Sequence, residues 1–149
     1  MLFTAHALSS GVAGESIGNA FLAILLGIFV HFVMDSIPHY DTTDDGKFTF
    51  RQILLAGTDL LLGCVIIYLL SKNFALSSSF YWGVVGGLLP DFFSLMPPVR
   101  RLTERYFIVR KFQEFHNHIQ KIKLGPILGL AVQIVIWLIS ICLLIYMQK

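Results

Sequence analysis

The sequence predicts an all-α integral membrane protein, a helical bundle of four transmembrane helices plus a short N-terminal helix. Three observations support this fold class: the composition, four long apolar runs, and an uneven distribution of basic residues. Of the 149 residues, 56% are hydrophobic and only 13% are charged, whereas soluble domains average about 25% charged residues. The mean hydropathy is +0.74. A chain of this length is expected to form one domain, residues 1–149.

The apolar runs define the expected helices, because a helix needs about 20 mostly apolar residues to cross a bilayer. Four runs approach this length, at residues 19–37, 52–70, 80–96 and 124–147. Two glycine pairs, Gly83 with Gly87 and Gly125 with Gly129, have the spacing that lets helices approach closely. Pro90 predicts a break near the end of the third run, since proline lacks the N–H that a helix interior uses.

Residues 1–14 are apolar but too short to cross a bilayer. Two arrangements are open for this segment. A re-entrant helix would enter the membrane and return through the first run, which would bring His6 to the level of His31. An interfacial helix would instead lie flat on the opposite side of the membrane. We favour the re-entrant arrangement.

Basic residues predict the orientation of the bundle. With four crossings, residues 38–51 and the basic segment 97–123 lie on the same side of the membrane. These two segments contain most of the basic side chains: Lys47, Arg51, Arg100, Arg101, Arg105, Arg110, Lys111, Lys121 and Lys123. The opposite side has Lys72 and Lys149. The positive-inside rule therefore assigns the basic side to the cytoplasm.

The end of the first run has the residue types of a metal site. His31 and Asp35 are four residues apart and share one helix face, and His39 and Asp41 follow Pro38. Imidazole and carboxylate groups in such proximity suit a divalent ion such as zinc. The alternative is a helix-end ion pair between His31 and Asp35 with local capping by Asp41.

Further ligand-type residues are predicted at the same, cytoplasmic side. Asp59 and Asp91 lie in the second and third runs, where an unpaired acid costs a few kcal/mol to insert. His116 and His118 precede the fourth run and would face different ways on a helix, and we prefer His116. Asp59 can instead pair with an arginine or serve a proton path, and Asp91 can cap a following helix. The predicted metal ligands are therefore His6, His31, Asp35, His39, Asp91 and His116.

The order of these motifs resembles a known family. The chain has Thr4-Ala5-His6, His31-x3-Asp35-x2-Pro38-His39, Gly86-Gly87-Leu88-Leu89-Pro90-Asp91 and His116-Asn117-His118. In this order they resemble the small bacterial inner-membrane proteins known as LexA-binding-related metal-dependent hydrolases, which are distantly similar to zinc-dependent phospholipase C. The resemblance implies a helical fold in the bacterial inner membrane, a His/Asp metal centre and hydrolase chemistry. Many members carry an Arg-Gly-x-Thr-His-Ser motif on a late helix, where this chain has Phe115-His116-Asn117-His118.

Together these observations lead us to expect a hydrolase that acts on a phosphoester, such as a lipid head group, at the cytoplasmic face. The metal would be zinc, with manganese and iron as alternatives. Asp59 or Asp41 would accept a proton from water, while Arg100, Arg101 and Arg105 would bind the substrate phosphate or simply set the topology beside anionic lipids. Membrane lipids are the expected partners, and no nucleic acid is expected. The alternatives are a small transporter and a non-catalytic membrane protein with a structural metal or a buried polar site.

Overall fold

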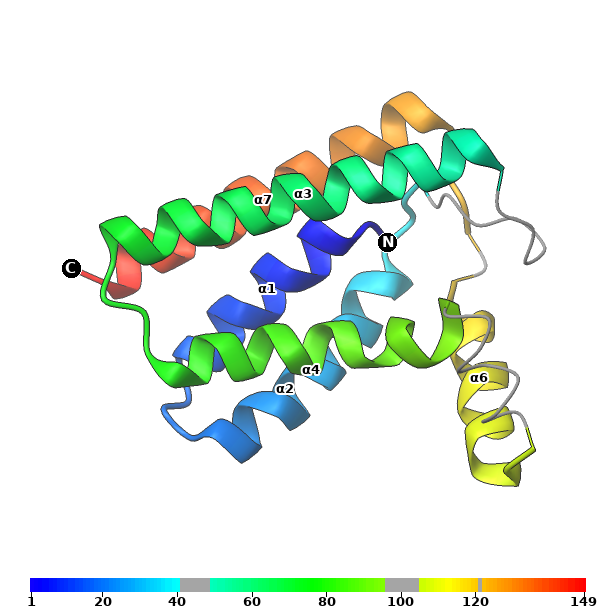
Figure 1. The fold of residues 1–149 in the computed structure, drawn as a ribbon, viewed down its shortest axis with the longest axis horizontal. Helices are drawn as coiled ribbons and strands as arrows, with labels where there is room; N and C mark the ends of the chain where they lie inside the picture. Colours follow the sequence, from blue (N-terminus) through cyan, green and yellow to red (C-terminus); the bar gives the residue numbers. More distant parts are fainter. Residues whose placement is uncertain (41–48, 96–104, 121) are drawn as a thin grey trace.

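Six helices form the described part of this computed structural model, which covers residues 1–40, 49–95, 105–120 and 122–149. They are α1 (Phe3–Glu15), α2 (Ala20–Ser36), α3 (Phe50–Asn73), α4 (Ser78–Leu95), α6 (Phe107–Ile119) and α7 (Pro126–Met147) (Figure 1). No strand occurs in these ranges, which confirms the predicted all-α class. α2, α3, α4 and α7 lie close to the four predicted apolar runs.

Helix α1 occupies the centre of the bundle. It packs against α2, α3, α4 and α7, and Figure 1 shows it running antiparallel to α2. Most of its side chains are buried, and many are small, including Ala5, Ala7 and Ser10. Small side chains let several neighbours pack close to one helix. The hairpin of α1 and α2 places His6 beside His31, with ring centroids 4.0 Å apart, as the re-entrant arrangement requires.

Glycines bring the backbones of α1, α2 and α4 into contact. A Cβ atom added at Gly27 of α2 would meet the carbonyl oxygen of Gly83 in α4, and one at Gly14 of α1 would lie 2.9 Å from the Gly83 Cα atom. A Cβ atom at Gly87 would meet the Ser10 hydroxyl group of α1. The predicted close-packing role of Gly83 and Gly87 is therefore confirmed.

Of the second glycine pair, Gly125 and Gly129, only Gly129 lies at a close contact. A Cβ atom at Gly129 would lie 2.7 Å from the Tyr40 Cα atom, whereas one at Gly125 would meet nothing within 4 Å. Gly129 therefore allows the segment after α2 to pass close to α7. Beside this contact, His39 and Lys123 form an isolated parallel bridge, and the Leu124 N–H donates to the His39 carbonyl group at 2.9 Å.

The expected break at Pro90 is wrong, because α4 continues through Pro90 to Leu95. A proline inside a helix removes one N–H donor and crowds the carbonyl group of the preceding turn. That turn contains Gly86 and Gly87, which have no side chains to add to the crowding. The Gly87 carbonyl oxygen accepts a hydrogen bond from His31 Nδ1 at 2.7 Å, so this part of α4 is also held by a neighbouring helix.

In the described part of the chain, two helices are long and apolar enough to cross a membrane. Their spans are Gln52–Asn73 in α3 and Pro126–Met147 in α7, with mean hydropathies of 2.3 and 2.7. Only 17% and 22% of their most apolar windows are buried, whereas the core helix of a soluble protein is mostly buried. The buried set contains many polar side chains, among them His6, His31, Asp35 and Gln133. The outer surface of the bundle is thus more apolar than its interior.

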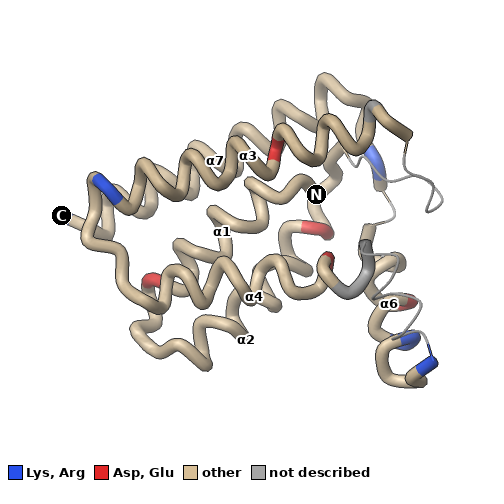
Figure 2. The backbone as a smooth tube through the Cα atoms, viewed as in Figure 1, with Lys and Arg blue, Asp and Glu red and all other residues tan. Residues whose placement is uncertain are grey.

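Basic residues lie at the two ends of the described bundle. Arg110 and Lys111 lie on α6, and Lys123 lies just before α7, at the end where Figure 2 shows most of the blue segments. Lys72 lies in the last turn of α3, at the opposite end. Lys111 Nζ lies 2.6 Å from Glu114 Oε2 on the exposed face of α6 and lowers the pKa of that carboxyl group.

Candidate metal centre

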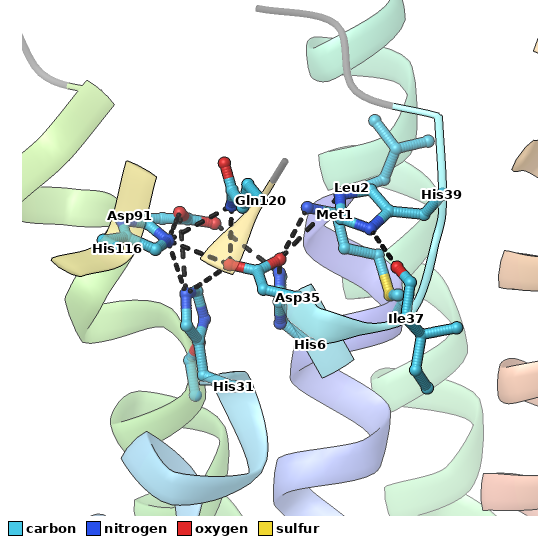
Figure 3. A network of polar contacts seen from close by, with 12 residues as sticks. Met1, Leu2, His6, His31, Asp35, Ile37, His39, Asp91, His116 and Gln120 are labelled. Carbon is cyan, nitrogen blue, oxygen red and sulfur yellow. Dashed lines mark hydrogen bonds and ion pairs between the residues drawn. The ribbon is translucent and has the colours of Figure 1, made fainter. Parts of the chain in front are cut away.

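Four ligand-type side chains from three helices converge at one end of the bundle. His31 and Asp35 come from α2, Asp91 from α4 and His116 from α6 (Figure 3). One ligand atom from each lies within 4.8 Å of the others. His31, Asp35 and His116 are buried. Because His31 and Asp35 are one helical turn apart, α2 alone presents two of the four groups to the same point.

The Asp35 carboxylate is the centre of this cluster. Its Oδ2 atom lies 3.1 Å from His31 Nε2, 2.9 Å from His116 Nε2 and 2.6 Å from the Gln120 amide nitrogen. The amino group of Met1 lies 2.9 Å from the other carboxylate oxygen, Oδ1. Taking a carboxylate out of water costs several kcal/mol unless it is paired and hydrogen-bonded. These contacts provide that compensation, and a bound cation would add to it.

The orientation of His31 suits metal binding. Its Nδ1 atom lies 2.7 Å from the Gly87 carbonyl oxygen, and because a carbonyl oxygen only accepts, Nδ1 must carry the proton. In the neutral ring, Nε2 then keeps its lone pair and faces Asp35. Histidines that bind metals usually donate their other ring nitrogen to a carbonyl or carboxylate group in this way.

Two further histidines lie beside the cluster. His6 of α1 is fully buried, and its Nε2 atom lies 3.2 Å from Asp35 Oδ1. His39 Nε2 lies 3.9 Å from the same oxygen. His39 Nδ1 donates to the Ile37 carbonyl group at 2.7 Å, so this ring also points Nε2 toward Asp35. The structure therefore brings all six predicted ligands to one place.

Asp91 is the most accessible member of the cluster. Its side chain is 17% exposed, whereas those of His31 and Asp35 are completely buried. Asp91 Oδ1 lies 3.6 Å from His116 Nε2 and 3.8 Å from His31 Nε2. Asp91 is therefore the member of the cluster with the most solvent contact.

Other predicted site residues lie elsewhere. Asp59 of α3 accepts a hydrogen bond from the Thr4 N–H at 3.0 Å, and its own carbonyl group accepts from the Thr4 hydroxyl at 2.8 Å. It thus caps the first turn of α1, where negative charge is favourable. Arg105 is exposed just before α6. Asp41, Arg100 and Arg101 lie outside the described residues.

Two polar residues were not predicted from the sequence: Gln120, which contacts the cluster, and Gln133, which is buried in α7. Gln120 follows His116 by one helical turn and contacts both Asp35 Oδ2 and His116 Nε2. Gln133, buried in the apolar helix α7, accepts from the Leu2 N–H at 2.8 Å and donates to the Tyr40 carbonyl group at 3.1 Å. Gln120 could have been predicted from its position four residues after His116, which places both on one helix face. Gln133 could have been predicted because it is a lone amide side chain in an apolar run.

The His31, Asp35, Asp91 and His116 cluster can hold a divalent metal ion. Its donor set consists of two imidazole nitrogens and two carboxylates. No protein-family model, curated protein or solved structure matches the chain.

Proposed function

We propose that this chain is a multi-pass membrane protein that hydrolyses a phosphoester, such as a lipid head group, at the cytoplasmic face of a bacterial inner membrane. The observation that carries the proposal is the buried group of His31, Asp35, Asp91 and His116 at the basic end of a bundle with an apolar exterior. The motif order that resembles inner-membrane metal-dependent hydrolases agrees with it. The preferred metal is zinc.

In this proposal α2, α3, α4 and α7 are the four crossings, and α1 is a helix inserted among them. α2 has 17 residues and α4 has 18, which at about 1.5 Å per residue nearly span a hydrocarbon core of about 30 Å. The amphipathic helix α6 would lie at the cytoplasmic interface. Its exposed Phe107 and Ile108 would face the lipid beside Arg110 and Lys111.

The proposed chemistry assigns separate tasks to the side chains. A bound divalent ion would polarise a phosphoryl oxygen and make water a better nucleophile near neutral pH. His31, His116 and the two carboxylates would hold it. Asp91, the most accessible member, would mark the side on which the substrate enters. Arg105, with Arg100 and Arg101, would contact the phosphate, and Asp41 remains the candidate proton acceptor, because Asp59 is bonded to Thr4.

An apolar groove supports a lipid as the substrate. It has a volume of about 470 Å³ and lies between α1, α2 and α7. Ser9 and Ala13 contribute from α1, Ile139 and Leu143 from α7, Met34 from α2, and Ile37 from the residue that follows α2. Met34 and Ile37 lie one residue before and two residues after Asp35 in the sequence, and no member of the metal cluster lines the groove. In the proposal, an acyl chain would occupy this apolar groove.

One observation favours a second function, a structural metal site. The cluster joins α6 to α2 and α4, and a metal there would hold α6 against the bundle. A structural ion has a closed shell of four protein ligands, whereas a catalytic ion keeps one position for water or substrate.

The test is hydrolysis by detergent-purified protein of a panel of phospholipids, with wild type beside His116→Ala. His118→Ala is the matched control, because His118 lies two residues away on the same helix and is exposed. We expect turnover in the wild type and in His118→Ala, abolition by a chelator with the helical fold intact, and loss of turnover in His116→Ala because it removes a metal ligand. Metal-loaded wild type without turnover, whose helices melt when metal is removed, would support the structural role instead.

A further inference from the structure

The two oxygens of the Asp35 carboxylate face two different groups of histidines. Oδ2 lies 3.1 Å from His31 Nε2 and 2.9 Å from His116 Nε2. Oδ1 lies 3.2 Å from His6 Nε2 and 3.9 Å from His39 Nε2. In Figure 3 the carboxylate lies between His31 and His116 on one side and His39 on the other. A carboxylate with ligand-type nitrogens on both oxygens is positioned as a bridge.

The two oxygens of the Asp91 carboxylate also face different histidines. Its Oδ1 atom lies 3.8 Å from His31 Nε2 and 3.6 Å from His116 Nε2, whereas its Oδ2 atom lies 3.9 Å from His6 Nε2. Both carboxylates therefore direct one oxygen toward the pair His31 and His116 and the other toward His6.

The surroundings of His6 are those of a candidate metal ligand. It is fully buried and stacks on His31 with 20° between the ring planes. Within the described ranges, neither of its ring nitrogens makes a hydrogen bond, although Nε2 lies near Asp35 Oδ1. Burying an imidazole without hydrogen bonds is costly. A cation held by Nε2 would remove part of this cost.

We infer that the cluster binds two divalent cations, bridged by the carboxylates of Asp35 and Asp91. The first is held by His31 and His116, and the second by His6 and His39. This inference rests on the metal centre of the proposed function but not on hydrolysis. It extends the four-residue site by two histidines, and it makes Asp35 and Asp91 ligands of both ions.

The spacing of the ligand atoms fits this arrangement. Metal–ligand bonds of about 2.0–2.2 Å in a tetrahedral shell place ligand atoms about 3.3–3.6 Å apart. The distances between the histidine nitrogens and the carboxylate oxygens run from 2.9 Å, for His116 and Asp35, to 3.9 Å, for His6 and Asp91. Two ions that share bridging ligands lie about 3.5–4 Å apart, which one carboxylate can span.

Charge also favours two ions and an anionic ligand. Two carboxylates balance only half of the charge of two divalent cations, so the completed site would be positive and would attract a phosphate group. The Met1 amino group lies 2.9 Å from Asp35 Oδ1. An ion bound by His6 would replace that positive charge at the same oxygen.

The test is the metal content of detergent-purified protein after saturation with zinc, measured by mass spectrometry. We expect two equivalents in the wild type and in His118→Ala, and one equivalent in His6→Ala and in His116→Ala. One equivalent in the wild type that persists in His6→Ala but is lost in His116→Ala would overturn the two-ion site and leave the proposed function standing. No bound metal would overturn both.

A second measurement needs no variant and so does not depend on His6→Ala folding. Wild type loaded with Mn²⁺ should give the electron paramagnetic resonance spectrum of an exchange-coupled pair, because two bridged ions lie close together. A six-line spectrum typical of isolated Mn²⁺ at full occupancy would contradict the bridged pair.

Discussion

Substitution of Gly27 by alanine tests whether backbone contact between α2 and α4 holds the cluster together. Gly27 lies one helical turn before His31, and its added Cβ atom would lie 2.9 Å from the Gly87 nitrogen, besides meeting the Gly83 carbonyl oxygen. Ordinary contacts at a Cβ atom are 3.4–4 Å. The two helices must therefore separate or shift, which also moves His31 relative to Asp91.

The expected effect can be estimated against a matched control. In an open helix, Gly→Ala stabilises by up to about 1 kcal/mol, and Gly57 in α3 is such a position, with nothing within 4 Å of an added Cβ atom. At Gly27 the same gain is opposed by an overpacking cost of about 1–3 kcal/mol. Both variants gain the same helix propensity, so Gly27→Ala should be less stable than Gly57→Ala by about the overpacking cost. This cost corresponds to a melting-temperature difference of roughly 2–12 °C for a chain of this size.

The assay is thermal unfolding in one detergent, together with metal affinity measured by competition with a chelator. Since metal–ligand distances tolerate only about ±0.2 Å, the shift of α2 against α4 should also weaken metal binding by about 10-fold or more. Equal melting temperatures and equal metal affinities for Gly27→Ala and Gly57→Ala would refute the role of this contact.

Three further substitutions have distinct expected outcomes. Gln120→Ala should lower metal affinity about 10-fold by removing the amide beside Asp35, with the exposed Asn117→Ala unchanged in chelator competition. Asp59→Asn should lower the unfolding free energy by about 0.5–2 kcal/mol, by weakening the cap on α1, and leave metal content unchanged; lost turnover at unchanged stability would instead identify Asp59 as catalytic. Ile139→Trp should reduce hydrolysis of long-chain lipids more than short-chain ones, whereas Leu138→Trp, outside the groove-lining set, should affect neither; equal loss on both substrates would remove the groove from the mechanism.

Much of the helical framework could be predicted from the sequence. The apolar runs are long and separated by polar or basic segments, so the positions of α2, α3, α4 and α7 follow from composition. The pairing of His31 with Asp35 follows from helical periodicity, and the expectation that His116 and His118 do not both join the site follows from their different helix faces. Such features depend on spacing along the chain, which the sequence contains directly.

The remaining features depend on contacts between distant segments. The continuation of α4 through Pro90 depends on the preceding glycines and on His31 from another helix. The capping of α1 by Asp59 requires α3 to lie beside the start of α1. An isolated carboxylate in an apolar run is equally compatible with a ligand, a base or a cap until its neighbours are known.

The most direct test of a metal centre is elemental analysis of detergent-purified wild type beside Asp35→Ala. Because Asp35 contacts His6, His31 and His116, its removal should affect every ligand group at once. We predict stoichiometric zinc, manganese or iron in the wild type and its loss in the variant. Wild-type protein without bound metal, even after incubation with each of these ions, would contradict the metal centre and leave a buried polar network in its place.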